Sequence, residues 1–275
     1  VLFRSYFVLT AVEVILLMFG GMSFYDALLH SFSTAGTGGF SNRNASVAYY
    51  DSAYIAGVIG VFMILFGINF NLYFLICMKK WKEALKNEEM RAYLGIIAAS
   101  VVIITVNILH ICESVGQAFR YSFFQVASII TTTGFATTDF NSWPEMSRTI
   151  LVILMFVGAC AGSTGGGVKV SRFVILMKTI RKELRQYLHP RSIKKIKMDE
   201  KLVEHEVVRS TNVFMIAYVL VFAFSALLIS FDNHDLITNF TSVAATLNNI
   251  GPGLELVGPT QNFSIFSGGA KLILI

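Results

Sequence analysis

Long apolar stretches separated by short polar connections dominate this sequence. They occupy about residues 6–22, 53–78, 92–112, 147–160 with 168–180, and 211–231. A helix of about 20 apolar residues crosses a hydrocarbon core roughly 30 Å thick. A buried soluble core accounts for one such stretch but not for several, and the mean hydropathy of +0.64 agrees with this. We therefore predict an all-α membrane protein with about five spans.

The basic residues are concentrated in two of the polar connections. Five Lys and Arg residues lie between positions 79 and 91, and ten lie between positions 178 and 209. The positive-inside rule places both segments in the cytoplasm and leaves the other, mildly acidic connections outside, where they attract cations. The net charge of +5 is therefore explained without a nucleic-acid partner, and membrane lipid is the expected surrounding.

The residues that enzymes commonly use are not arranged for chemistry. Cys77, Cys112 and Cys160 are far apart and lie in or beside apolar segments, so neither a disulfide framework nor a zinc knuckle is expected. No two of the five histidines have metal-ligand spacing with a nearby carboxylate. We predict no enzymatic activity and no catalytic cofactor.

One pattern occurs three times along the chain: an apolar helix, a polar turn, a short amphipathic half-helix and a Thr/Gly-rich loop. The three copies of the turn, half-helix and loop read SFYDALLHSFSTAGTGGFSN, SVGQAFRYSFFQVASIITTTGFATTDFN and DLITNFTSVAATLNNIGPGLELVG. Aligning them on their glycines places Gly38, Gly134 and Gly251 in register. The pattern predicts three repeated units at 1–79, 92–180 and 210–275, joined by cytoplasmic connections at 80–91 and 181–209.

The half-helices are too short to cross a bilayer, and the loops after them are not helical. Such backbone is tolerated at membrane depth only where it lines a water-filled cavity or is buried in protein. Glycine permits the dihedral angles that turn carbonyls towards one axis, and rings of carbonyls can replace the water around a potassium ion. Gly-rich membrane segments also mark close helix packing, but three copies at matching positions favour a pore.

The segments STAGTGGFSN, TTTGFATTDFNSWP and NNIGPGLELVGP resemble the second, third and fourth pore loops of the Trk/Ktr/HKT potassium transporters. The NNIGPG loop and the long connection before the last unit favour the Trk branch. The resemblance implies a pseudo-fourfold pore through which potassium is transported. It assigns the filter carbonyls to Gly36, Thr37, Gly38, Thr132, Thr133, Gly134, Asn249, Ile250 and Gly251.

Four such loops form one filter in the family, and three are visible here. We therefore expect the sequence to be a fragment that lacks the first repeat and the end of the last. The resemblance also implies a homodimer in the bacterial inner membrane. It further implies a cytosolic nucleotide-binding regulatory subunit of the TrkA type that meets the basic cytoplasmic face.

The span after the second loop is interrupted at Gly158–Gly167, which reads GACAGSTGGG. So many glycines do not continue a stable straight helix. A phosphate-binding loop is excluded because the Gly-Lys-Ser/Thr ending is absent, whereas a kink that accommodates neighbouring helices stays open. In the family a mobile loop at this place obstructs the pore beneath the filter. The resemblance assigns this gate to Gly162, Ser163, Thr164, Gly165, Gly166, Gly167 and Lys169.

The leading functional prediction is therefore a gated potassium channel or uptake subunit. The alternative is a secondary transporter that couples potassium to sodium or protons, because broken helices around a midplane site are also typical of that class. Three re-entrant loops of one repeated topology favour the pore. Lys169 and Arg172, which follow the interruption, either anchor the next helix at the inner interface or influence ion entry.

Overall fold

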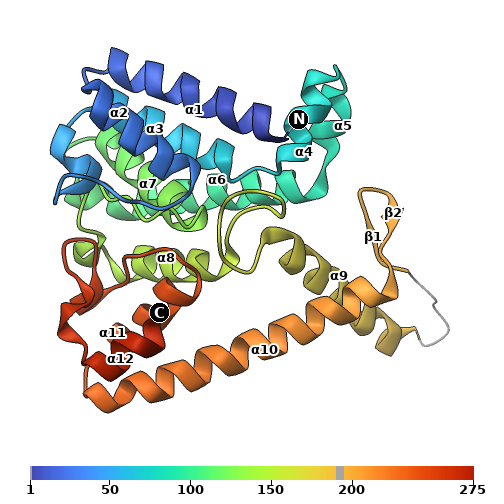
Figure 1. The fold of residues 1–275 in the computed structure, drawn as a ribbon. Helices are drawn as coiled ribbons and strands as arrows, with labels where there is room; N and C mark the ends of the chain where they lie inside the picture. Colours follow the sequence, from blue (N-terminus) through green and yellow to red (C-terminus); the bar gives the residue numbers. More distant parts are fainter. Residues whose placement is uncertain (1, 190–194) are drawn as a thin grey trace.

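The computed structural model describes residues 2–189 and 195–275, and its regular elements are almost all helices (Figure 1). Residues 190–194 of the predicted connection 181–209 lie outside the described residues. The first part of the chain contains α1 (Leu2–Phe19), α2 (Phe24–Ala35), α3 (Ala53–Phe66), α4 (Phe70–Cys77) and α5 (Trp81–Lys86). The second contains α6 (Glu88–Ile108), α7 (Val115–Ile130), α8 (Glu145–Val157) and α9 (Val170–Leu188).

The last part of the chain begins with a small hairpin. It contains β1 (Lys197–Met198), β2 (Lys201–Leu202), α10 (His205–Ile229), α11 (Leu236–Leu247) and α12 (Gly268–Leu274). The two strands pair antiparallel, with Lys197 opposite Leu202. Short 3₁₀ segments occur in the connecting loops. The all-α membrane fold predicted from the sequence is confirmed.

Three helices are the expected half-helices. α2, α7 and α11 have 12, 16 and 12 residues, so at 1.5 Å per residue they span about 18 to 24 Å, less than a hydrocarbon core. Each begins at a capping side chain that accepts a backbone N–H of the first turn: Ser23, Ser114 and Asp235. The polar turns identified in the sequence therefore set where the half-helices begin.

The stretch 53–78, expected to be a single span, is broken. α3 and α4 meet at an angle of 91°, and the break covers residues 67–69. At the break, a Cβ on Gly67 would collide with the Tyr93 hydroxyl, and the Asn69 side chain caps α4 by accepting the Asn71 N–H at 2.9 Å. The apolar composition hid this break, because Asn69 and Asn71 lie within a long and otherwise largely apolar run.

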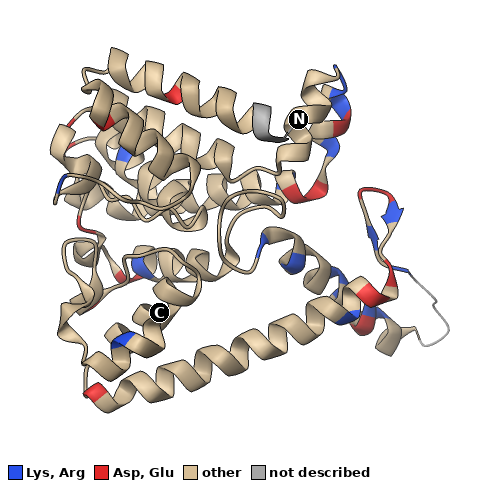
Figure 2. Cartoon of the chain, viewed as in Figure 1, with Lys and Arg blue, Asp and Glu red and all other residues tan. Residues whose placement is uncertain are grey.

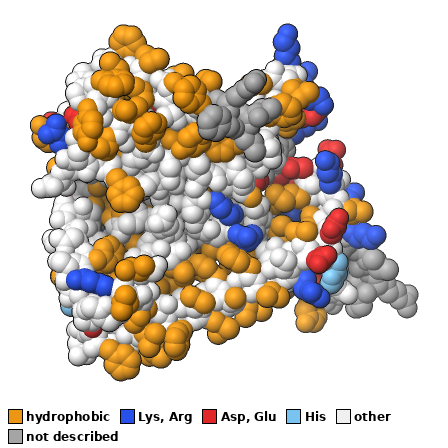
Figure 3. Space-filling view, viewed as in Figure 1, with side chains coloured by type: hydrophobic (Ala, Val, Ile, Leu, Met, Phe, Trp, Pro, Cys, Tyr) orange, Lys and Arg blue, Asp and Glu red, His pale blue; other side chains and the backbone are white. Residues whose placement is uncertain are grey.

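In the part of the chain that the structure describes, two helical segments are long and apolar enough to cross a membrane by themselves, Glu88–Ile111 and His205–Asp232. Most of the second segment is exposed, and hydrophobic side chains follow α10 along the lower edge of the molecule (Figure 3). The exposed apolar side chains on α10 include Val213, Ile216, Val219, Leu220, Phe224 and Leu227. A surface of this kind is suited to contact with lipid.

Charged side chains collect at one end of the molecule. Figure 2 shows them on α5, the hairpin, the end of α9 and the start of α10, whereas most of α10 carries none. This is the end that the basic connections predict to be cytoplasmic.

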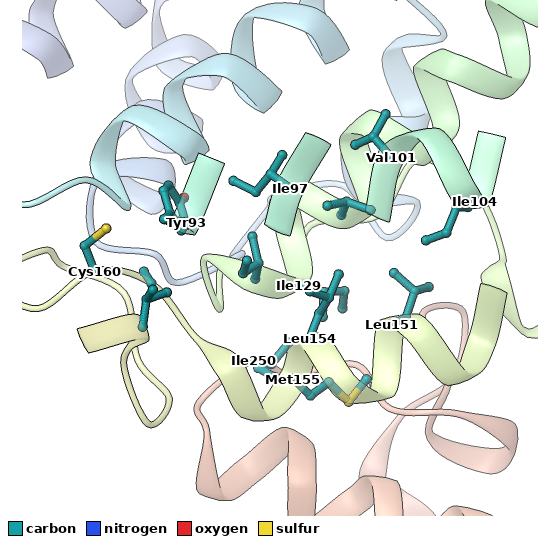
Figure 4. Close-up of a cluster of buried hydrophobic side chains, with 14 of the residues drawn as sticks. Tyr93, Ile97, Val101, Ile104, Ile129, Leu151, Leu154, Met155, Cys160 and Ile250 are labelled. Atoms are coloured by element: carbon teal, nitrogen blue, oxygen red, sulfur yellow. The ribbon is translucent and has the colours of Figure 1, made fainter. Parts of the chain in front are cut away.

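The largest apolar core lies between α6, α7 and α8 (Figure 4). Ile97 and Val101 of α6 face Ile129 of α7 and Leu154 of α8. The side chain of Ile250, from the loop after α11, enters the same cluster. The core therefore joins a loop of the third unit to the helices of the second.

Candidate functional site

The three Thr/Gly loops have the same backbone. We name them loop 1 (residues 36–39), loop 2 (131–134) and loop 3 (248–251). In each, the third residue donates its N–H to a carbonyl five positions earlier: Gly38 to Ser33 at 2.7 Å, Thr133 to Ser128 at 2.9 Å, and Ile250 to Ala245 at 2.7 Å. Each loop therefore leaves its half-helix through the same turn.

This pattern corrects the alignment of loop 1 by one residue. Left-handed backbone occurs at the fourth position of every loop, with φ of 66° at Gly39, 85° at Gly134 and 103° at Gly251. The sequence alignment placed Gly38 with Gly134, but the structural equivalent of Gly134 is Gly39. Loop 1 contains two consecutive glycines, so matching glycines alone left two registers open. The shared Gly-Phe pairs, Gly39-Phe40 and Gly134-Phe135, were the signal that identifies the right one.

Left-handed backbone also occurs at the second position of each loop. Here the residues are Thr37, Thr132 and Asn249, with φ of 49°, 58° and 57°. This conformation is strained for a β-branched residue and persists only where the surrounding structure imposes it. In each loop, residues of positive φ at the second and fourth positions therefore alternate with residues that do not have positive φ.

The loops touch one another through their backbones. A Cβ on Gly39 would collide with the carbonyl oxygen of Thr133, and a Cβ on Gly134 would collide with the carbonyl oxygen of Ile250. Loop 2 therefore lies between loops 1 and 3, and all its threonines are buried. Gly36, which caps α2, is exposed by comparison. The close approach explains why glycine is required at the fourth position of loops 1 and 2, whereas at Gly251, where a Cβ would meet nothing within 4 Å, the φ of 103° alone favours glycine.

The chain after each loop is fixed to the half-helix that precedes it. Ser41 bonds to His30 at 3.0 Å in the first unit, and Ser128 donates to the Phe135 carbonyl at 2.6 Å in the second. In the third unit Thr241 accepts the Leu254 N–H at 3.0 Å. Each of these hydrogen bonds ties the chain beyond a loop back to its half-helix, and loop side chains add further bonds, such as that from the Thr131 hydroxyl to the Ala127 carbonyl at 2.7 Å.

The interruption between α8 and α9 forms a separate loop, residues 158–169, which we call the glycine loop. It carries left-handed backbone at Gly158, Gly162, Gly167 and Lys169. It contains every residue assigned to the gate from the sequence, from Gly162 to Gly167 together with Lys169. Such backbone cannot belong to a continuous helix, which agrees with the predicted interruption.

The glycine loop contacts the beginning of all three Thr/Gly loops. Thr37 of loop 1 donates its hydroxyl to the Thr164 carbonyl at 3.2 Å. Thr132 of loop 2 accepts the Gly166 N–H at 2.5 Å. A Cβ on Gly166 would lie 2.5 Å from the carbonyl oxygen of Asn248 in loop 3. These contacts place the glycine loop directly against the C-terminal ends of the half-helices.

The remaining gate residues fold the glycine loop back on itself. The Ser163 hydroxyl donates to the Cys160 carbonyl at 2.6 Å, and the Lys169 ammonium donates to the Gly165 carbonyl. Gly165 also lies against loop 2, since a Cβ there would be 3.0 Å from the Thr131 carbonyl oxygen. Arg172 in the first turn of α9 stacks on the Phe214 ring of α10, 4.0 Å from its centroid. This packing favours the anchoring interpretation of Arg172.

Sequence reasoning missed four contributors to the site. Gly39 was misaligned, as described above. The carbonyls of Thr131 and Asn248 lie against the glycine loop, and their residue types do not predict this contact. Glu89 of α6 accepts backbone N–H groups from the glycine loop region, but an acidic residue in the first turn of a helix is ordinary.

Comparison with known proteins gives one consistent result. The family described as cation transport protein, TrkH, matches residues 2–275. The Trk system potassium uptake protein TrkH of Salmonella typhimurium is 39% identical over the whole chain, and TrkG of Escherichia coli is 32% identical over 99% of it. The crystal structure of the potassium transporter TrkH from Vibrio parahaemolyticus superposes with a TM-score of 0.92 at 36% identity, over 99% of this chain.

The chain spans 57% of the length of the Salmonella relative and 59% of the Vibrio structure. The matches extend from one end of the chain to the other, and they confirm the expected multi-pass, inner-membrane location. The chain therefore belongs to the TrkH family of cation transport proteins.

Proposed function

We propose that the protein carrying this chain transports potassium through a filter lined by the backbone carbonyls of loops 1 to 3. The observation that carries the proposal is that three loops with the same backbone turn contact one another, loop 1 with loop 2 and loop 2 with loop 3. With the corrected register, the filter residues are Thr37–Gly39, Thr132–Gly134 and Asn249–Gly251. The half-helices direct the negative ends of their dipoles towards the same place, which favours a cation there.

We also propose that the glycine loop is the gate. It contacts loops 1, 2 and 3 at once, so an ion leaving the filter on that side meets it. Because residues 165 and 166 are glycines, the glycine loop can lie against the carbonyls of Thr131 and Asn248. Conduction then requires the loop to move away from the half-helix ends.

Rubidium uptake by the full-length protein in liposomes tests the proposal. A membrane potential alone is expected to drive uptake, and added potassium is expected to compete. The intact protein is also expected to restore growth of a potassium-uptake-deficient bacterium at low potassium. Uptake that requires a sodium or proton gradient would support the coupled transporter, and absence of uptake under every condition would contradict both.

The corrected register gives a matched pair of substitutions. Gly39→Ala is expected to lower rubidium uptake at least about tenfold, because the residue is left-handed and its Cβ would strike the Thr133 carbonyl. Gly38→Ala is expected to have a smaller effect, since its nearest neighbour is the movable Phe40 ring at 2.9 Å. Equal losses, or a larger loss at Gly38, would contradict the register.

Family membership also suggests partners for the whole protein. We propose a homodimer and a cytosolic nucleotide-binding regulatory subunit that meets the charged end of the molecule. Basic residues that share this end are Lys178, Arg181, Lys182, Arg185, Lys195 and Lys197. Co-purification of the regulator, lost when these charges are reversed, is the expected result.

A further inference from the structure

We propose that the first turn of α6 is the point that ties the glycine loop to the hairpin, with Glu89 as the positioning residue. This proposal rests on the proposed function in one respect: the tie affects transport only if the glycine loop is the gate. The contacts that form the tie can be tested separately from transport.

Glu89 holds both sides of the glycine loop through one oxygen atom. Its Oε1 accepts the Ala161 N–H at 2.6 Å and the Ser171 N–H at 3.0 Å. The whole segment assigned to the gate lies between these two amides. Glu89 is 4% exposed, so water does not compete for these hydrogen bonds. Bonds to a carboxylate in such surroundings are strong.

Backbone groups also tie the glycine loop region to its surroundings. The Cys160 N–H donates to the Gly67 carbonyl at 3.0 Å, the Phe70 N–H donates to the Gly162 carbonyl at 3.2 Å, and the Val170 N–H donates to the Ala159 carbonyl at 3.0 Å. These bonds connect the region to the α3–α4 break and close its own base. Glu89 therefore supplies a side-chain contact that a substitution can remove.

The residues next to Glu89 hold the hairpin. Asp199, in the hairpin turn, accepts the Asn87 side-chain N–H at 2.7 Å and the Glu88 backbone N–H at 2.7 Å. Lys178 of α9 pairs with Glu88 and donates to the Lys197 carbonyl at 2.6 Å. Three consecutive residues, Asn87 to Glu89, thus bond to the hairpin, to α9 and to both sides of the glycine loop.

This arrangement gives a short route from the charged end of the molecule to the gate. Displacement of the hairpin pulls on the first turn of α6, and Glu89 moves with that turn. The hydrogen bonds from the Ala161 and Ser171 amides to Glu89 then either break or pull the glycine loop along with the helix. The route consists of the first turn of α6, its hydrogen bonds and the Lys178–Glu88 ion pair, so single substitutions interrupt it.

Hydrogen–deuterium exchange of the full-length protein in nanodiscs tests the tie without measuring transport. Glu89→Ala is expected to speed exchange of peptides covering residues 159–171 about tenfold, the effect of losing a charge-assisted hydrogen bond. Glu89→Gln is expected to give an intermediate value, since its amide oxygen still accepts. Asp199→Ala is expected to speed exchange in the hairpin and, less strongly, in the glycine loop.

Glu83→Ala is the matched control, because Glu83 on the adjacent α5 is exposed and pairs with exposed Lys80. It is expected to leave exchange in the glycine loop unchanged. Unchanged exchange of the glycine loop in Glu89→Ala would overturn the role of Glu89. Unchanged exchange of the glycine loop in Asp199→Ala would overturn the connection to the hairpin. If Glu89→Ala does not fold, glycine loop exchange in Glu89→Gln is measured instead, and exchange as slow as in the native protein would overturn the role of Glu89.

Rubidium uptake separates the tie from the proposed function. Glu89→Ala is expected to change uptake in the absence of any regulator, with Glu89→Gln restoring much of the native behaviour. Faster loop exchange combined with native uptake would leave the tie standing and would reject the glycine loop as the gate.

Discussion

Replacing Gly134 with valine is expected to abolish rubidium uptake by the full-length protein. Gly134 has φ of 85°, and its absent Cβ faces the Ile250 carbonyl at a distance that no side chain permits. A β-branched residue is a conformational outlier there, and the strain and collision together cost more than about 2 kcal/mol. The carbonyls of loops 2 and 3 must therefore separate, and the proposed ion site with them.

Gly95→Val is the matched control for this substitution. Gly95 lies inside α6, and a Cβ there would meet nothing within 4 Å. We expect uptake close to that of the native protein, with equal yield and elution volume for both variants. Normal uptake by a well-folded Gly134→Val protein would refute the filter assignment.

Substitution of Gly166 by alanine is expected to act in the opposite direction and raise uptake. The backbone of Gly166 is not left-handed, so alanine causes no conformational strain. Its Cβ would lie 2.5 Å from the Asn248 carbonyl oxygen and 3.0 Å from the Thr132 hydroxyl, so the glycine loop has to withdraw from the half-helix ends. A penalty of about 1.4 kcal/mol on the closed arrangement corresponds to a tenfold shift towards the open one.

The measurement is rubidium uptake into liposomes in the absence of a regulatory subunit, where the native protein is expected to be slow. Gly268→Ala serves as the control, because a Cβ at Gly268 meets nothing within 4 Å. Lower uptake in Gly166→Ala, with native uptake in Gly268→Ala, would contradict a blocking role for the glycine loop.

The repeated pattern made the fold predictable from the sequence. Apolar stretches, the polar turns and the glycines of the loops are all local signals, and the half-helices that they predicted are present in the structure. The break at residues 67–69 escaped because the sequence around it remains apolar. There the bend depends on packing against Tyr93, which is distant in the sequence.

The site was less predictable than the fold, because its decisive contacts join distant residues. The family resemblance located the glycine loop, but the pairing of Thr37 with Thr164 and of Thr132 with Gly166 comes from tertiary packing. Glu89 is one of two adjacent glutamates at the start of α6, and the sequence does not distinguish them. In the structure, Glu88 pairs with Lys178, whereas Glu89 is buried against the glycine loop.

The position of Ile250 has a consequence for how this protein family can change. Its carbonyl oxygen lies against Gly134, while its side chain packs in the core formed by α6, α7 and α8. A substitution of Leu154 or Met155 in that core therefore acts on the backbone beside Gly134 without changing any loop residue. The contact between loops 2 and 3 therefore depends on the packing of the second unit as well as on the loop residues themselves.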